Sequence, residues 1–153
     1  MDMNFQKNLL IKSVLILALV LGSSLAFASD EHKITFHIDE KNEKKMHLVL
    51  NNTANVIKYY QNKGDEVTVE VVAYGPGLHM LRSDTSPKKV QKRIKSFEQN
   101  FENVSFRACS NTQRKMSKKA GKDVKLLSQA KMVPSGVVHL VERQEAGWSY
   151  IRP

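Results

Sequence analysis

Segments with the period of a β-strand alternate with segments with the period of a helix along most of this chain, and this alternation limits the folds open to it. The clearest strand is residues 66–74, where Val67, Val69 and Val71 alternate before an apolar run at 71–73. Apolar residues on both faces are typical of a central strand covered on both sides. The other expected strands are residues 33–39, 104–109 and 137–142, with a short edge strand at 148–151.

Helical spacing fills the intervals between these strands. Residues 43–61 carry apolar side chains every three or four positions, and Ser86 followed by Pro87 is a typical helix start. Further helices are expected at 111–119 and 123–130, with a short helical turn at 78–82. This order predicts one α/β domain with a mostly parallel open sheet of four to five strands and helices on both faces.

Ligands of such sheets bind at the carboxyl ends of the strands. That edge is expected to hold Asp39, residues 74–77, residues 109–112 and the residues after Glu142. The segment at 75–77, Gly-Pro-Gly, lacks the spacing of a nucleotide phosphate loop, so we interpret it as a tight turn that lets the backbone approach a neighbour closely.

Cys109, the chain's single cysteine, is the main candidate for chemistry. Ser110 and Gln113 form a capping-box pattern, which predicts that Cys109 lies just before a helix N-terminus. The partial positive charge at a helix N-terminus favours thiolate over thiol, and Arg107 on the same strand face would add a full charge. The alternative is that Cys109 only fills space, because free cysteines are often buried.

The remaining candidate residues carry weaker signals. His79 follows the Gly-Pro-Gly turn and would reach the Cys109 edge, where a Cys–His pair could activate the thiol; a packed or solvated role is the alternative. Four further histidines lack metal-ligand spacing, and one cysteine does not make a structural zinc site. The sequence therefore predicts neither a metal nor a cofactor. These histidines are His32, His37, His47 and His139.

The first 28 residues have the parts of a secretory signal peptide. Lys7 and Lys12 precede an uncharged, mostly apolar run at 13–28, which ends in a small-residue cleavage pattern at 26–28. We expect cleavage before Ser29, a single domain over residues 29–153, a periplasmic or secreted location and no stable membrane insertion after cleavage.

The net charge of +9 narrows the choice of partners. Export makes nucleic acid an unexpected partner for a basic chain, which leaves small anions, acidic proteins or an anionic surface. A single cysteine outside the cytosol forms no internal disulfide, so it is either paired between molecules or reactive.

Four motifs, in order, resemble the DsrE/DsrF-like family, and more closely its exported branch. They span essentially the whole exported part: residues 69–77 (VEVVAYGPG), 106–112 (FRACSNT), 133–138 (VPSGVV) and 144–153 (QEAGWSYIRP). The resemblance implies a small α/β domain that assembles into trimers or hexamers. In sulfur-relay members a cysteine carries sulfane sulfur as a persulfide, and by position this role falls on Cys109.

These observations favour an exported sulfane-sulfur carrier or sulfurtransferase-like protein that uses Cys109, with Arg107 stabilising the thiolate. Its partners would be a sulfur donor or acceptor protein, or polysulfide. The alternative is a non-catalytic oligomeric binding module in which Cys109 is merely packed. A third hypothesis is a redox or thiol-modification sensor.

Overall fold

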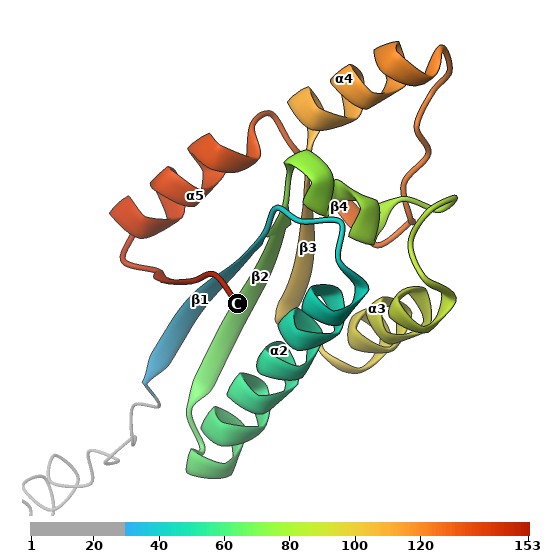
Figure 1. Cartoon of the computed structure of the whole chain (residues 1–153). Helices are drawn as coiled ribbons and strands as arrows, with labels where there is room; N and C mark the ends of the chain where they lie inside the picture. Colours follow the sequence, from blue (N-terminus) through green and yellow to red (C-terminus); the bar gives the residue numbers. More distant parts are fainter. Residues whose placement is uncertain (1–29) are drawn as a thin grey trace, which may run out of the picture.

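Five parallel strands form one sheet, as the alternation of strand and helix predicted, and their order is β4-β3-β2-β1-β5 (Figure 1). The computed structural model describes residues 30–153, so the expected signal peptide and its cleavage before Ser29 lie outside the described residues. The elements are β1 Glu31–Ile38, α2 Glu43–Lys63, β2 Glu66–Ala73, the 3₁₀-helix η1 Gly75–Leu81, α3 Lys88–Asn100, β3 Val104–Cys109, α4 Ser110–Ala120, β4 Ala130–Val133, α5 Gly136–Glu145 and β5 Ser149–Ile151.

One face of the sheet carries the hydrophobic core. Phe36 of β1, Val71 of β2 and Phe106 of β3 point to this face, and none of them is more than 2% exposed. Helices α2 and α3 cover it, in front of the sheet in Figure 1, and contribute Leu50 and Ile94. The two-residue period of the strands therefore meets the three-to-four-residue period of the helices, as the pattern predicted.

The opposite face is polar and is covered by α5. At its centre lies Glu70 of β2, which is 2% exposed and bound by two arginine side chains and one histidine side chain. Arg107 of β3 donates to it at 2.8 and 2.5 Å, the His139 ring lies 2.6 Å away, and Arg143 donates at 2.9 Å. Since His139 and Arg143 both belong to α5, this carboxylate fastens the helix to the sheet.

The expected strand at 137–142 is wrong, because this segment belongs to α5. Its β-branched residues Val137, Val138 and Val141 favoured a strand, but all three are about half exposed on the outer side of the helix. The inward residues follow helical spacing instead, with Leu140 and the two Glu70 ligands facing the sheet.

The expected helix at 123–130 is also wrong. Here the backbone pairs with the segment after η1 rather than with itself: Ser83 N–H donates to Lys125 O at 3.0 Å, and Leu127 N–H donates to Leu81 O at 2.8 Å. The chain then enters β4, which pairs with β3. It is the fourth strand of the sheet, which was expected from the sequence at residues 137–142. The short edge strand at the C-terminus is confirmed as β5.

The carboxyl ends of the strands lie together at the top of Figure 1, where η1, α4 and the start of α5 surround them. Helix α4 projects beyond the sheet edge and has no buried residue, whereas α5 folds back over the sheet. Within residues 30–153, no helix combines the length and apolar character that crossing a membrane requires.

Candidate functional site

Cys109 ends β3 and caps α4, so it lies at the strand-to-helix junction that the sequence predicted. The expected capping box is wrong. Ser110 is the first helical residue rather than the cap, and the Gln113 side chain donates to Val124 O at 2.9 Å instead of reaching back to the helix start. Cys109 takes the capping position with an extended backbone, φ −73° and ψ 114°.

The surroundings of Cys109 favour its thiolate. The residue is 4% exposed, and burial raises the pKa of its thiol. Hydrogen bonds from the Thr112 hydroxyl and from the backbone N–H groups of Gly136, Thr112 and Asn111 act the other way, and the net pKa is lowered. Asn111 and Thr112 begin α4 and Gly136 begins α5, so the sulfur faces the N-termini of two helices.

Gly136 allows this close approach. A Cβ atom at this position would lie 2.9 Å from Tyr74 Cβ and 3.3 Å from Cys109 Cβ, closer than side chains normally pack. The first residue of α5 can therefore reach the sulfur only because it lacks a side chain. Tyr74, which follows β2, forms the other wall of this contact.

The Thr112 hydroxyl connects Cys109 to the Gly-Pro-Gly turn. Thr112 Oγ1 accepts a hydrogen bond from Gly75 N–H at 3.0 Å, so its own proton is free to point at the sulfur. The expected close approach of the backbone is confirmed at Gly77, where a Cβ atom would lie 2.1 Å from Ile38 O, although the segment opens the 3₁₀-helix η1 rather than forming a tight turn. Gly75 has φ +50°, a conformation that favours glycine.

An aromatic cluster continues from Tyr74 towards β1 and β5. The His37 ring stacks on the Tyr74 ring at 4.6 Å, and His37 Nδ1 lies 2.8 Å from the Tyr150 hydroxyl. Burial lowers the pKa of His37, which keeps its imidazole neutral near pH 7. Burial, followed by the charges of Asp39 and Tyr150, raises the pKa of Tyr74, and the Cys109 charge adds to this effect. Cys109 therefore shares its sheet edge with the protonated phenol of Tyr74 and the neutral imidazole of His37.

The structure places the other two candidate residues in different roles. The Arg107 guanidinium is bound by Glu70, which lies opposite Ser105 and so draws the side chain back along β3, away from Cys109. Arg107 is not among the groups that lower the Cys109 pKa. His79 Nδ1 lies 2.8 Å from Thr85 Oγ1, and burial, together with Lys41 and Arg82, lowers its pKa.

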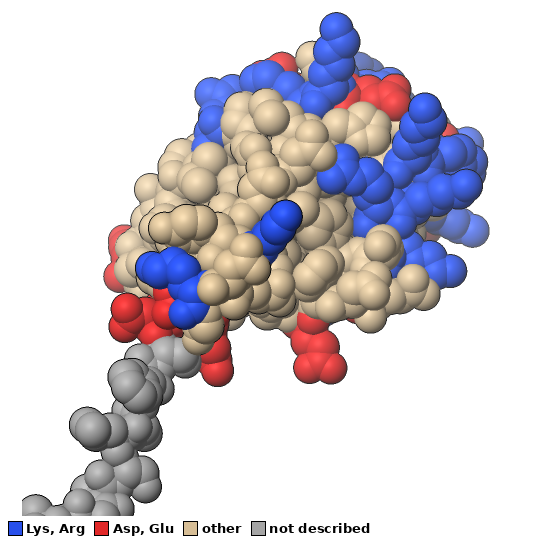
Figure 2. Space-filling model, turned by 90° about the horizontal axis from the view of Figure 1, so that it is seen from below, with Lys and Arg blue, Asp and Glu red and all other residues tan. Residues whose placement is uncertain are grey.

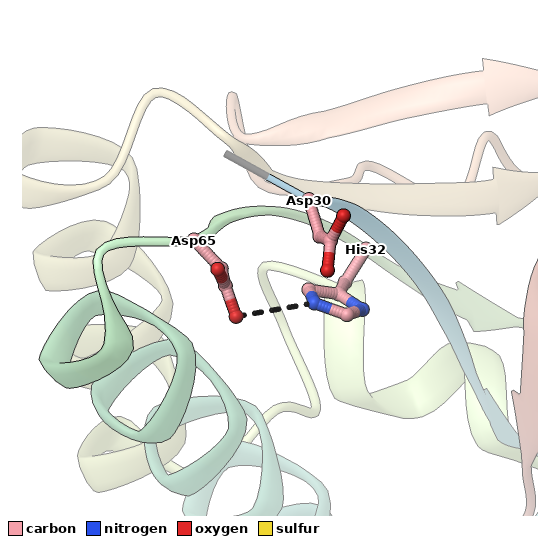
Figure 3. Close-up of side chains that lie close together, drawn as sticks. All are labelled: Asp30, His32 and Asp65. Carbon is pink, nitrogen blue, oxygen red and sulfur yellow. Dashed lines mark ion pairs between the residues drawn. The ribbon is translucent and has the colours of Figure 1, made fainter. Parts of the chain in front are cut away.

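A second cluster lies at the opposite edge of the sheet, where the strands begin (Figure 3). Asp30, His32 and Asp65 have ligand atoms that all lie within 4.8 Å of one another, an arrangement that the sequence spacing did not indicate. His32 Nε2 lies 3.4 Å from Asp65 Oδ2, and Lys63 Nζ lies 3.4 Å from the same oxygen. Asp65 thus already pairs with His32 and Lys63, and the cluster lies at the sheet edge opposite Cys109.

Basic side chains gather on the side of the molecule that carries α3 and α4 (Figure 2). Both helices are rich in exposed lysine, and α4 brings its lysines to the sheet edge that holds Cys109. The exposed basic residues of the two helices are Lys88, Lys89, Lys92, Lys95, Arg114, Lys115, Lys118 and Lys119.

Comparison with known proteins finds solved structures with the same fold. One of them is an archaeal protein of unknown function, MTH1491 from Methanobacterium thermoautotrophicum, with 36% sequence identity and a TM-score of 0.65. The match covers 80% of this chain and 99% of the archaeal one. This chain belongs to the same family as MTH1491. No protein-family model and no curated protein matches it.

The fold of this chain explains which site residues could be predicted from the sequence and which could not. Asp39, Tyr74, Cys109 and Thr112 were expected at the carboxyl edge, and the structure places all four there. Gly136 was missed because residues 137–142 were interpreted as a strand, which removed the second helix N-terminus. A serine and a glycine after Pro134, with Arg143 in the last turn, were the available signal for a helix.

Proposed function

We propose that this protein is an exported, DsrE-like sulfane-sulfur carrier in which Cys109 holds the sulfur as a persulfide. The observation that carries the proposal is the set of hydrogen bonds around Cys109, where two helix N-termini and the Thr112 hydroxyl lower the thiol pKa. A thiolate is the nucleophile in sulfur exchange, and the same donors would stabilise the anionic outer sulfur of a persulfide.

The DsrE-like assignment rests on the four sequence motifs, three of which supply residues of the site. Tyr74 and Gly75 come from the first motif, Cys109 and Thr112 from the second, and Gly136 from the third. These residues contact one another across separate strands and helices. The motifs thus coincide with the surroundings of one sulfur atom.

The exposed outer face of α5 supports the further proposal that the protein is a homo-oligomer. Val137, Val138 and Val141 are each 47–54% exposed, and Tyr150 and Ile151 of the edge strand β5 are 39% and 37% exposed. Exposed apolar patches of this kind commonly mark interfaces between subunits.

The packed-cysteine alternative has one observation in its favour, the 4% exposure of Cys109. In that case the protein is a binding module, and its thiol should react only on unfolding. The two proposals therefore differ in a measurable property of the folded protein.

Mass spectrometry after incubation with polysulfide separates the proposals. The wild-type protein should gain sulfur-sized mass increments that dithiothreitol removes, and Cys109→Ser should gain none, because a serine hydroxyl is too weakly acidic to attack sulfane sulfur. The substitution changes size little, so stability should fall by no more than about 1–2 kcal/mol. Absence of sulfur on a folded wild type whose Cys109 resists alkylation would leave the binding module.

A further inference from the structure

A cleft of about 430 Å³ lies between the Gly-Pro-Gly turn and α4. Thr112 is one of its lining residues, and the hydroxyl of Thr112 is also one of the groups that donate a hydrogen bond to the Cys109 sulfur. Tyr74, whose pKa responds to the Cys109 charge, also lines the cleft. A ligand in the cleft that reaches Thr112 would therefore lie within one residue of the sulfur.

The lining of the cleft combines positive charge with soft, apolar surface. Lys115 and Lys119 stand one helical turn apart on the same side of α4, and no residue that lines the cleft is acidic. Pro76 and the thioether of Met116 supply the apolar part. The volume lies within the range of small-molecule sites, about 300–1,000 Å³.

We propose that this cleft binds small anionic sulfane-sulfur compounds, such as thiosulfate and inorganic polysulfide, and presents their outer sulfur to Cys109. A chain of sulfur atoms is polarisable and weakly hydrated, which suits Met116 and Tyr74, whereas its charged end suits the two ammonium groups. This inference rests on the proposed carrier function and names the class of donor.

The transfer needs no further reactant. The Cys109 thiolate attacks the outer sulfur of thiosulfate, a new sulfur–sulfur bond forms, and the bond to the sulfonate group breaks. Sulfite leaves with the bonding electron pair, and Cys109 keeps the outer sulfur as a persulfide anion. With polysulfide, the leaving group is a polysulfide dianion one sulfur shorter.

A small anion fits the cleft better than a protein donor does. Specific protein complexes bury about 800 Å² on each partner, which requires a broad surface rather than a recess of this size. The charges that the cleft offers are two point-like ammonium groups, which suit a compact dianion.

Two double variants test the cleft. Lys115→Ala/Lys119→Ala removes both ammonium groups, and Lys118→Ala/Lys122→Ala removes the same charge from exposed positions nearby that do not line the cleft. Polysulfide loading, followed by mass spectrometry, should slow about five- to tenfold in the first variant and less than twofold in the second. Alkylation of Cys109 by neutral iodoacetamide should proceed at the same rate in both.

Equal slowing in both double variants would overturn the inference, because the effect would then come from the general positive field. Slowing in neither would overturn it as well. A calorimetric titration of Cys109→Ser with thiosulfate separates the two proposals, since this variant binds but does not react. Thiosulfate binding that depends on Lys115 and Lys119 without sulfur loading of the wild type would refute the carrier function and retain the cleft. Sulfur loading of the wild type without such binding would refute the cleft.

Discussion

Replacing Glu70 by glutamine should destabilise the fold more than the same carboxylate-to-amide substitution at any other position of the sheet. Glu70 is 2% exposed and receives hydrogen bonds from Arg107, His139 and Arg143. An amide keeps the shape but loses the charge and turns an N–H₂ group towards these donors. Removing one partner of a buried ion pair costs about 3–5 kcal/mol.

The partial exposure of two of the partners reduces this figure. Arg107 and Arg143 are 24% and 31% exposed, so water can rehydrate them in part, and we expect a loss of about 2–4 kcal/mol at pH 7. For a domain of this size that corresponds to a fall in Tm of roughly 10 °C. Glu66→Gln makes the same chemical change at an exposed position of the same strand and should shift stability by about 0.5 kcal/mol or less.

The difference between wild type and Glu70→Gln should depend on pH. Burial raises the pKa of Glu70, but the hydrogen bonds from His139, Arg143 and Arg107 outweigh it, so the folded-state pKa is lowered. A carboxylate with a lowered pKa contributes stability above its unfolded pKa and loses that contribution as the pH falls through the folded value. The difference in Tm should therefore shrink as the solution becomes acidic enough to protonate Glu70 in the folded protein.

Thermal unfolding followed by circular dichroism, at a series of pH values, tests this reasoning. Equal Tm values for Glu70→Gln and Glu66→Gln at pH 7 would refute the role of Glu70 in holding α5 to the sheet. A difference in Tm that stays the same as the solution becomes acidic would show that the carboxylate charge is not its source.

Three further changes test the site and the assembly. Gly136→Ala should push the start of α5 away from Tyr74 and Cys109, cost about 1–3 kcal/mol and raise the pH midpoint of Cys109 alkylation; an unchanged midpoint would contradict the close approach. Thr112→Val should also raise that midpoint and cost about 1–2 kcal/mol, because Gly75 N–H loses its acceptor; chemical denaturation measures the cost, and Thr112→Ser, which keeps the hydroxyl, is the control. Light scattering at micromolar concentration should show a trimer or hexamer, and Val138→Lys on the exposed side of α5 should weaken it; a monomeric wild type would refute the proposal.

The sequence predicted the fold well where one period dominated. In β3 the buried residues alternate from Val104 to Ala108, and β2 ends in a continuous buried run, as expected for a central strand. In α2 the apolar spacing runs from Met46 to Ile57 between an Asn42 cap and Gly64. Prediction failed in the last third of the chain, where local preference and tertiary contacts disagreed. The valines of α5 favour a strand locally, but the tie from Glu70 to His139 and Arg143, contacts of more than 60 residues in separation, holds the segment as a helix.

The same distinction between local and tertiary signals separates the site features that the sequence predicted from those that it did not. The thiolate-stabilising environment of Cys109 was anticipated from one helix N-terminus, since that signal is local in sequence. Arg107 was expected to stabilise the Cys109 thiolate because the two residues share a strand face. Sequence alone does not reveal that Glu70 lies on the neighbouring strand, opposite Ser105 and two residues back from Arg107. The contribution of α5 was missed because residues 137–142 were interpreted as a strand, and its place beside Cys109 also depends on β4 being the neighbour of β3.

Sheet topology explains why two helices begin at one sulfur atom. In a parallel sheet every helix that follows a strand begins at the carboxyl edge, and neighbouring strands bring their following helices side by side. Val133 of β4 pairs with Cys109 of β3, so α5 begins three residues beyond the cysteine's own neighbour. Helix α4 then projects outwards while α5 returns over the sheet, which leaves both N-termini facing Cys109 and opens the cleft on the α4 side. The lowered pKa of the thiol thus arises from the Thr112 hydroxyl and from backbone N–H groups of Gly136, Thr112 and Asn111 that strand order brings to the sulfur. Gly136 allows this approach because it has no side chain.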